Sequence, residues 1–225
     1  MSLSELFTKP INDLTFAVVD TETTGMYPQF SRVMDIGIVI VKNGEVVDKW
    51  QSLINPQQSV PRWITHYTHL TYKDVKGKPL FSELVGKISK YLKNKIFVAH
   101  NVNFDYWFLF NEMKRLEYEF SYPKLCTVLL GRKLLPNLPS ANLDMLADYY
   151  NLKISQRHRA LPDAEAAAYI LIEFIKVAKE KYGVRNYFDL EKLQWIYAPR
   201  NAPRSGFNAF GDYGGNKSGL FDGML

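Results

Sequence analysis

Two acidic residues follow an apolar run near the N-terminus of the chain. In the segment AVVDTETTGM, residues 17–26, Asp20 and Glu22 stand two positions apart. In a strand, side chains at i and i+2 point to the same face, so the two carboxylates would face one small volume and repel each other. Mg²⁺ or Mn²⁺ relieves such repulsion, because both ions prefer carboxylate oxygen. The pair predicts a divalent metal site, and two exposed acids at a strand end are the alternative.

A third acid lies in AHNVNFDYWFL, residues 99–109, where a short apolar strand leads into a predicted helix. Asp105 falls in the first turn of that helix, where its charge also suits the helix dipole. Capping chemistry alone can account for an acid at this position, so the segment leaves a catalytic and a structural role open.

A fourth acid lies in HRALPDAEAAAYILI, residues 158–172. We predict that Asp163 opens a helix, with Pro162 at the first helical position, where proline is favoured. His158 lies in the preceding loop and is the natural proton acceptor at neutral pH. Arg157 and Arg159 flank the histidine and can hold phosphates, or they are ordinary surface charges. We expect His158 to share a site with Asp163.

The elements that must position these residues follow from the hydrophobic pattern. Residues 14–20, 33–42 and 45–53 read as strands, and Asn43-Gly44 between the last two is a strong hairpin signal. An antiparallel meander results, with the first strand central because both of its faces are apolar. Short strands at 96–99 and 124–127 then alternate with helices, predicted at 81–94, 104–116, 127–134, 142–150 and 163–181. We predict an α/β fold with a mixed five-stranded sheet flanked by helices.

Composition sets broader bounds. The chain has 225 residues, of which 47% are hydrophobic, enough for a substantial core. Its net charge of +5 suits an anionic partner such as nucleic acid, and equally a generic basic protein. Cys126 is the only cysteine, so an intrachain disulfide is excluded. No signal peptide or membrane span is recognisable, and we expect a cytoplasmic protein without a membrane partner.

The composition changes near residue 198. The last residues, 199–225, hold six of the 13 glycines and show no hydrophobic period. We predict one folded domain at 1–198 followed by a flexible Gly-rich tail at 199–225. Aromatic residues in the tail suit docking to a partner, and a tail without a role is the alternative.

Taken together, the motifs resemble those of the DEDD superfamily of 3′→5′ exonucleases, in the subtype with a histidine in its last motif. They are DTETTG (20–25), HNVNFD (100–105) and HRALPD (158–163). The segments INPQQSVPRWIT (54–65) and 127–152 add a resemblance to the epsilon proofreading subunit of bacterial DNA polymerase III. The resemblance covers residues 13–180 and implies a ribonuclease H-like fold.

The resemblance also implies a chemistry. Two divalent ions, Mg²⁺ or Mn²⁺, would be held by Asp20, Glu22, Asp105 and Asp163, with Asp20 bridging both. Glu22 and Asp163 would complete one site and Asp105 would support the other. His158 would take a proton from the attacking water, and a nucleoside monophosphate would leave from a 3′ end.

Further residues are expected at the substrate. The segment Thr23 to Met26 would cradle the 3′-terminal nucleotide, with Met26 as a wedge against the bases or as ordinary packing. Aromatic residues at the start of the second-motif helix would stack on bases or, for most of them, belong to the core. The predicted substrate-binding residues are Thr23, Thr24, Gly25, Met26, Asn101, Phe104, Arg157 and Arg159. One departure from the family is His69, which stands where a glycine is common and leaves the conformation of its loop open.

Three functions compete on this basis. The leading one is DNA proofreading or repair, favoured by the epsilon-like segment 127–152. RNA trimming or oligoribonucleotide degradation would use the same acids. A module that tethers a polymerase or a sliding clamp is the third, and residues 200–225 would then bind a DNA polymerase catalytic subunit. Clamp binding has weak support, because GLF (219–221) lacks a preceding glutamine and QWIY (194–197) is a loose match.

Overall fold

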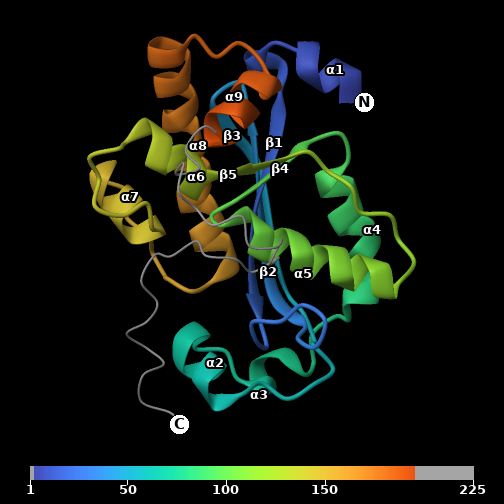
Figure 1. Cartoon of the computed structure of the whole chain (residues 1–225). Coiled ribbons are helices and arrows are strands. Elements are labelled where there is room, and N and C mark those ends of the chain that lie inside the picture. The colour runs from blue at the N-terminus through green and yellow to red at the C-terminus, as the bar shows by residue number, and fades with distance from the viewer. Residues whose placement is uncertain (1–2, 196–225) are drawn as a thin grey trace, which may run out of the picture.

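The computed structural model describes residues 3–195. Its centre is one five-stranded sheet with the strand order β3-β2-β1-β4-β5 (Figure 1). Neighbours β3, β2 and β1 pair antiparallel, and β4 and β5 join parallel to β1. The strands are β1 Thr15–Thr23, β2 Val33–Lys42, β3 Glu45–Leu53, β4 Ile96–Ala99 and β5 Lys124–Cys126. The predicted mixed sheet and its central first strand are confirmed.

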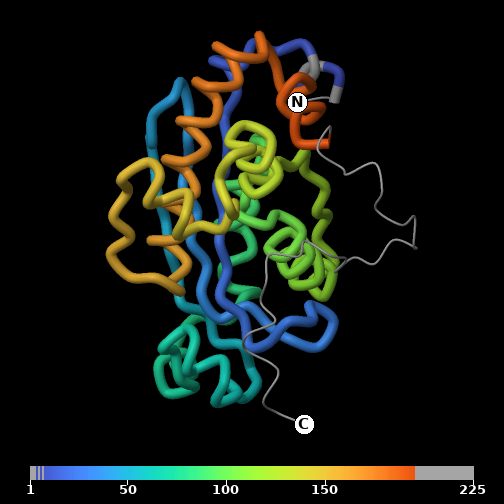
Figure 2. Tube along the Cα trace, turned by 60° about the vertical axis from the view of Figure 1, so that its left-hand side comes forward, coloured from blue at the N-terminus to red at the C-terminus, as the bar shows by residue number. Residues whose placement is uncertain are grey.

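Helices cover both faces of the sheet, which explains why β1 is apolar on both sides. Phe16 and Val18 of β1 pack in one core with α6, α7, α8 and α9, whereas Ala17 and Val19 pack in a second core with α4 and α5. Figure 1 shows the strands between these layers, and in Figure 2 the layer with α6, α7 and α8 is turned forward. The helices are α1 Leu3–Thr8, α2 Arg62–Thr68, α3 Tyr72–Val75, α4 Phe81–Leu92, α5 Val102–Arg115, α6 Thr127–Leu134, α7 Leu143–Tyr149, α8 Ala160–Tyr182 and α9 Tyr187–Trp195, with a 3₁₀ turn at Ile11–Asp13.

The hairpin between β2 and β3 forms where the sequence predicts it. Asn43 has φ 54° and Gly44 has φ 76°, so both central residues adopt the left-handed conformation that a two-residue hairpin turn requires. The long strand β2 is buried along nearly its whole length, because β1 and β3 flank it and α8 covers it.

Two predicted boundaries are wrong. Strand β1 continues three residues past its predicted end at Asp20, so Glu22 also lies within the strand. Helix α8 begins at Ala160, which makes Pro162 its third residue instead of its first. Both elements run longer because tertiary pairing extends them: β2 pairs with β1 up to Thr23, and β2 also seats the start of α8.

The open edge of β5 is closed by a side chain. Gln194 of α9 is 3% exposed; its Oε1 accepts the N–H of Cys126 at 2.9 Å, and its Nε2 donates to the carbonyl of Lys124 at 3.3 Å. The amide thus satisfies backbone groups that an edge strand would expose. The side chain of Gln194 is therefore bonded inside the fold and is not available to bind a clamp through the loose motif QWIY. Trp195 is the last residue of α9 and is exposed, whereas residues 196–197 of that motif and the predicted tail lie outside the described residues.

In the described part of the chain, no helix has both the length and the apolar character needed to cross a membrane.

Candidate active site

Three carboxylates meet near the C-terminal end of β1. Oxygen atoms of Asp20, Glu22 and Asp163 all lie within 4.8 Å of one another. Asp20 and Glu22 share the face of β1 that carries Phe16 and Val18, so both point toward α8, whose first turn supplies Asp163. The predicted sharing of one face by the first two acids is what brings the third acid to them.

The electrostatics of this acidic cluster, Asp20, Glu22 and Asp163, are unfavourable. Burial, together with the neighbouring carboxylates, raises the pKa of Asp20 well above its ordinary value. Burial and the charge of Asp163 raise the pKa of Glu22 to about 8, and burial raises that of Asp163. Each shift expresses the cost of a negative charge in a poorly solvated place beside other negative charges. A bound cation would remove that cost.

The oxygen atoms of the cluster fit a hard divalent cation. Asp163 Oδ1 is buried and has no hydrogen-bond partner among the described residues. Buried polar atoms are nearly always satisfied, so an orphaned carboxylate oxygen beside two further carboxylates points to a ligand. Mg²⁺ and Mn²⁺ take such oxygen ligands, and the residues present are compatible with either ion.

Asp105 approaches from the opposite side of the sheet. It lies in the first turn of α5, is 2% exposed, and its Oδ1 accepts both the N–H and the Oγ1–H of Thr21, each at 2.8 Å. Thr21 alternates with Asp20 and Glu22 along β1, so its side chain faces α5. Burial raises the pKa of Asp105 to about 7 despite these two bonds. The charge of Asp105 contributes in turn to the raised pKa of Asp20.

His158 lies in the loop that leads into α8. Its backbone has φ 59°, and its N–H donates to Asp163 Oδ2 at 3.1 Å. Its ring packs on the ring of Tyr67 from α2, with centroids 4.3 Å apart and planes tilted by 53°. The predicted proximity of His158 and Asp163 is thus present in the structure. Tyr67 was missed by sequence reasoning, because nothing in RWITHYT marks it as a neighbour of residue 158.

The two arginines beside His158 bind carboxylates. Arg157 Nη1 pairs with Asp163, and its Nε donates to Asp144 Oδ1 of α7 at 2.5 Å. Arg159 Nε donates to Asp35 Oδ2 of β2 at 3.0 Å. The phosphate-binding role of Arg157 and Arg159 stays a prediction, and each would have to combine it with these ion pairs.

A glycine that the sequence did not mark allows the helix to reach the acids. Gly37 of β2 stands opposite Asp20 in the strand register, on the α8 face. A Cβ at this position would lie 2.5 Å from the backbone carbonyl of Ala160, the first residue of α8. Only a glycine admits this approach of helix backbone to sheet. A glycine inside a strand pattern was the available signal, since it often marks a close backbone approach.

The segment after the acids is folded back on itself. Thr23 Oγ1 donates to the carbonyl of Gly25 at 2.6 Å, and Thr24 Oγ1 accepts the N–H of Arg32 at 2.9 Å and a bond from Gln58. A Cβ at Gly25 would lie 2.5 Å from the Ser31 hydroxyl oxygen, so the loop closes around this glycine. The segment is ordered by its own bonds.

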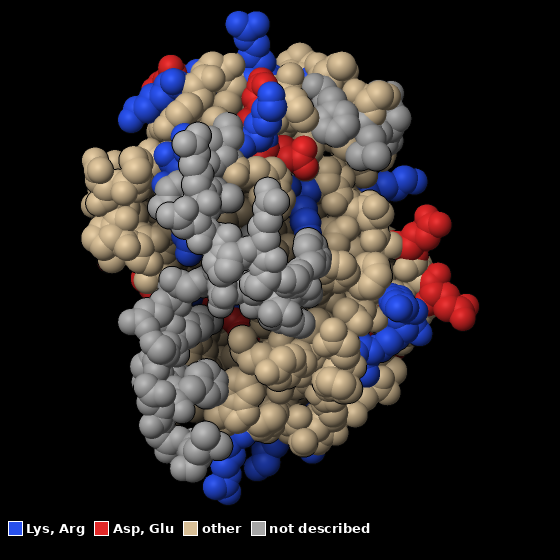
Figure 3. Space-filling model, in the orientation of Figure 1, with Lys and Arg blue, Asp and Glu red and all other residues tan. Residues whose placement is uncertain are grey.

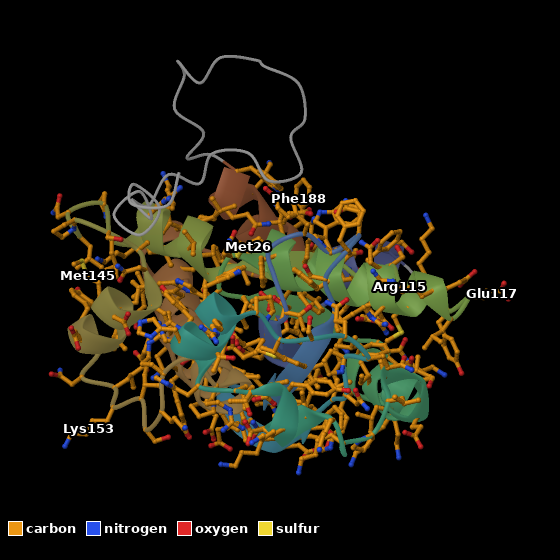
Figure 4. The ribbon with its side chains drawn as sticks, turned by 90° about the horizontal axis from the view of Figure 1, so that it is seen from below. Met26, Arg115, Glu117, Met145, Lys153 and Phe188 are labelled. Atoms are coloured by element: carbon orange, nitrogen blue, oxygen red, sulfur yellow. The ribbon has the colours of Figure 1, made fainter. Side chains whose placement is uncertain are left out.

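The β1–β2 loop is also fixed to α5. Arg32 forms a two-point ion pair with the buried Glu112 at 2.8 and 2.9 Å, and Arg115 Nη2 donates to the carbonyl of Pro28 at 2.8 Å. Met26 on this anchored loop is 41% exposed and Phe30 is 82% exposed. In the view from below, Met26 lies toward the middle of the molecule and Arg115 farther out along α5 (Figure 4). The role of Met26 as a wedge against the bases stays a prediction.

The aromatic residues of α5 divide as expected. Tyr106 packs edge-on against Phe97 and Phe120 and belongs to the core. Phe104 is half-buried against Phe108, with ring centroids 4.8 Å apart. Asn101 precedes α5 with a left-handed φ of 70° and is exposed. The substrate contacts predicted for Phe104 and Asn101 stay predictions.

His69 adopts a backbone conformation that glycine adopts most readily. It caps the end of α2 with φ 58° and ψ 13°, in the left-handed region. A histidine holds this conformation at the cost of some backbone strain.

Sheet order, the four acids and the histidine together define a hydrolytic exonuclease of the DEDD superfamily. Residues 17–171 match the model of the RNase T family, which is described as an exonuclease. The chain belongs to this family, and the resemblance inferred from its motifs is confirmed.

Curated relatives include polymerases. The chain is 34% identical over 183 residues to the PolC-type DNA polymerase III of Thermotoga maritima, a match that covers 81% of this chain and 13% of that protein. The PolC-type DNA polymerase III of Staphylococcus epidermidis is 33% identical with the same coverage. The chain therefore corresponds to a small part of these relatives.

Solved structures share the fold. Exonuclease X in complex with 5′ overhanging duplex DNA has a TM-score of 0.62 at 24% identity, covering 80% of this chain and 99% of that one. E. coli exonuclease I in complex with a dA16 oligonucleotide has a TM-score of 0.65 at 18% identity, covering 76% of this chain and 42% of that one.

Proposed function

We propose that this protein is a metal-dependent 3′→5′ exonuclease that removes nucleoside monophosphates from DNA 3′ ends in proofreading or repair. The observation that carries the proposal is the acidic cluster at the end of β1, with its raised carboxylate pKa values and the orphaned Oδ1 of Asp163. No hydrogen bond within the described residues satisfies that oxygen, and a bound divalent cation would.

Asp20, Glu22 and Asp163 would hold one divalent ion, and Asp105 together with Asp20 would support a second. When bound, the two ions supply a polarised water and stabilise the charge on the attacking and leaving oxygens. The bonds from Thr21 fix the Asp105 carboxylate, which leaves its other oxygen for this purpose. Mg²⁺ and Mn²⁺ suit the all-oxygen ligand set equally.

His158 would accept the proton of the attacking water. Its ring is held from one side by Tyr67, and its backbone is tied to Asp163, which belongs to the cluster. A histidine positioned in this way beside carboxylates acts as a base near neutral pH. The loop carries no other imidazole, so we expect the loss of His158 to remove the base.

The 3′-terminal nucleotide would lie against the segment Thr23 to Met26. Internal bonds order this segment, and the exposed side chain of Met26 is available to contact a base. Asn101 and Phe104 would line the same end of the sheet from α5. Lys and Arg side chains are dispersed over the part of the surface visible in Figure 3, so the proposal rests on the site and not on a basic stripe.

DNA is favoured over RNA by the relatives. The matched proteins include DNA polymerases, and exonuclease X and exonuclease I with bound DNA share the fold. Because the PolC-type relatives carry the matching segment within one long chain, we propose that a polymerase catalytic subunit is a partner of this chain. Residues 200–225 are the proposed contact.

The test is a gel assay with 5′-labelled single-stranded DNA, mispaired duplex DNA and single-stranded RNA of one sequence. Each is incubated with Mg²⁺, Mn²⁺ or EDTA, with wild type beside Asp20→Asn. A metal-dependent ladder that shortens from the 3′ end on DNA, absent in the variant, supports the proposal. A ladder mainly on RNA moves the function to RNA trimming, and no ladder on any substrate leaves the tethering module as the function.

The partner is tested separately by pull-down of the polymerase subunit with the full chain and with a chain ending at residue 199. Equal recovery by both forms would remove residues 200–225 as the contact.

A further inference from the structure

A further carboxylate, buried in the sheet, lies beside the acidic cluster and does not belong to it. Asp35 of β2 stands opposite Glu22 in the strand register and is 0% exposed. Gln51 Nε2 donates to its two oxygens at 3.1 and 3.0 Å, and Arg159 Nε donates to Oδ2 at 3.0 Å. A charge this deeply buried is tolerated only with such partners. Asp35 is therefore satisfied from inside the protein.

The partners of Asp35 lie at one point of the chain. Arg159 is the residue before the first turn of α8, and the N–H of Ala160, the first residue of that helix, lies 3.5 Å from Asp35 Oδ2. His158 directly precedes this pair. Gly37 lies two residues further along β2, and the backbone carbonyl of Ala160 packs closely against it. Strand β2 thus fixes the place where the histidine loop becomes helix.

His158 lies between two anchored neighbours. Arg157 on one side is tied to Asp163 and Asp144, and Arg159 on the other is tied to Asp35. The histidine itself has φ 59°, a conformation that residues other than glycine rarely adopt unless the surroundings impose it. The anchors supply that constraint.

We propose that the Asp35–Arg159 ion pair is a positioning device, which holds the His158 loop and the first turn of α8 against the acidic cluster. Arg159 acts through Asp35 and does not contact a substrate phosphate. The inference rests on the proposed exonuclease function for its kinetic consequences and on the ion pair alone for its structural ones. It assigns to Asp35 a role in catalysis without contact to substrate.

A double-mutant cycle tests the proposal, with Asp35→Asn, Arg159→Gln and the double variant measured for kcat and KM in saturating Mg²⁺. A base displaced by about 1 Å loses on the order of 100-fold in rate, so we expect each single variant to lower kcat by about 10- to 100-fold with KM unchanged. Because both residues act as one unit, the double variant should be no slower than the slower single variant.

A phosphate-binding arginine gives a different result. Arg159→Gln would then raise KM and reduce the salt dependence of binding, and Asp35→Asn would leave both unchanged. That pattern overturns the proposal, as do additive effects in the cycle.

The chain offers a matched control in Lys49 and Glu165. This pair also joins the sheet to α8, from β3, with Nζ and Oε1 2.7 Å apart, and its side chains are 57% and 28% exposed. Surface pairs contribute little, so Glu165→Gln should retain wild-type kcat. Arg159→Lys keeps the charge with fewer donors, and we expect it to recover part of the kcat lost in Arg159→Gln.

A second readout does not depend on activity. Amide hydrogen exchange of residues 156–161 in EDTA should be at least several-fold faster in Asp35→Asn than in wild type or Glu165→Gln. Unchanged exchange overturns the positioning device even if wild type degrades no nucleic acid. If wild type degrades no nucleic acid but exchange is still faster in Asp35→Asn, the proposed function is refuted and the positioning device stands.

Discussion

Two sets of carboxylates in this fold have opposite surroundings. Asp35 and Glu112 are 0% and 1% exposed, and each is bonded to an arginine and to a backbone N–H. Asp20, Glu22 and Asp163 lie against one another, with one arginine among them and one oxygen without a partner among the described residues. Asp163 is buried like Asp35 and Glu112, so burial does not mark the site. What marks the site is the shortage of compensating partners, which a bound cation or added protons would correct.

The strongest test of this contrast is Asp20→Asn. We expect kcat to fall about a thousandfold or more, because several kcal/mol of transition-state stabilisation through bound cations are lost. In EDTA the same variant should unfold at a higher temperature than wild type, since one of the mutually repelling charges is gone. Initial rates and thermal unfolding curves measure the two effects. A variant less stable than wild type in EDTA would show that the cluster is compensated after all.

The satisfied set should respond in the opposite sense to Glu112→Gln. The Arg32 and Arg115 guanidiniums lose their charged partner, and we expect about 2–3 kcal/mol of unfolding free energy to be lost, with or without metal. Urea denaturation measures this. Because Glu112 also anchors the β1–β2 loop, KM should rise more than kcat falls. Equal stability of the variant and wild type would remove the distinction between the two sets.

Gly37→Ala separates the acids without changing any charge. The new methyl group meets the Ala160 carbonyl, so the first turn of α8 must move away from β1. We expect a loss of about 1–3 kcal/mol from overpacking and weaker Mg²⁺ binding by calorimetry. Gly86→Ala is the control, because nothing lies within 4 Å of its added Cβ. Unaltered Mg²⁺ affinity in Gly37→Ala would mean that the close approach of α8 to β2 at Gly37 is not needed for the metal site.

The metal-free protein should also show a pH dependence of its stability. The pKa of Glu22 is raised to about 8 and that of Asp105 to about 7, so between roughly pH 5 and 8 the folded state binds more protons than the unfolded state. Stability must therefore fall as pH rises through this window. Each kcal/mol lost lowers the unfolding temperature by about 2–4 °C in a protein of this size. Melting curves in EDTA check the slope, and a rising curve would contradict the raised pKa values.

Added Mg²⁺ should reverse this slope, because a ligand that binds only the folded state and competes with protons gains affinity as pH rises. The Asp20→Asn variant serves as the control, and its slope should be flatter in EDTA and respond weakly to Mg²⁺.

Sequence alone determined the features that depend on local pattern. Alternation along residues 17–22 placed Asp20 and Glu22 on one face, and Asn43-Gly44 specified the turn by its need for positive φ at two positions. The three acidic motifs could be recognised because each combines residues within six positions of one another. The family and the four acids follow from these motifs without any structure.

Tertiary structure decided the partners, since contacts across 84 and 124 residues leave no local trace. Asp35 meets Arg159 only because β2 lies beneath the start of α8, and Gly37 is required only because Ala160 approaches it. The bond of Asp105 to Thr21 follows from α5 covering the other face of β1. Residue types and spacing determine which groups can do the chemistry, and packing decides which charges are compensated and which are left for a ligand.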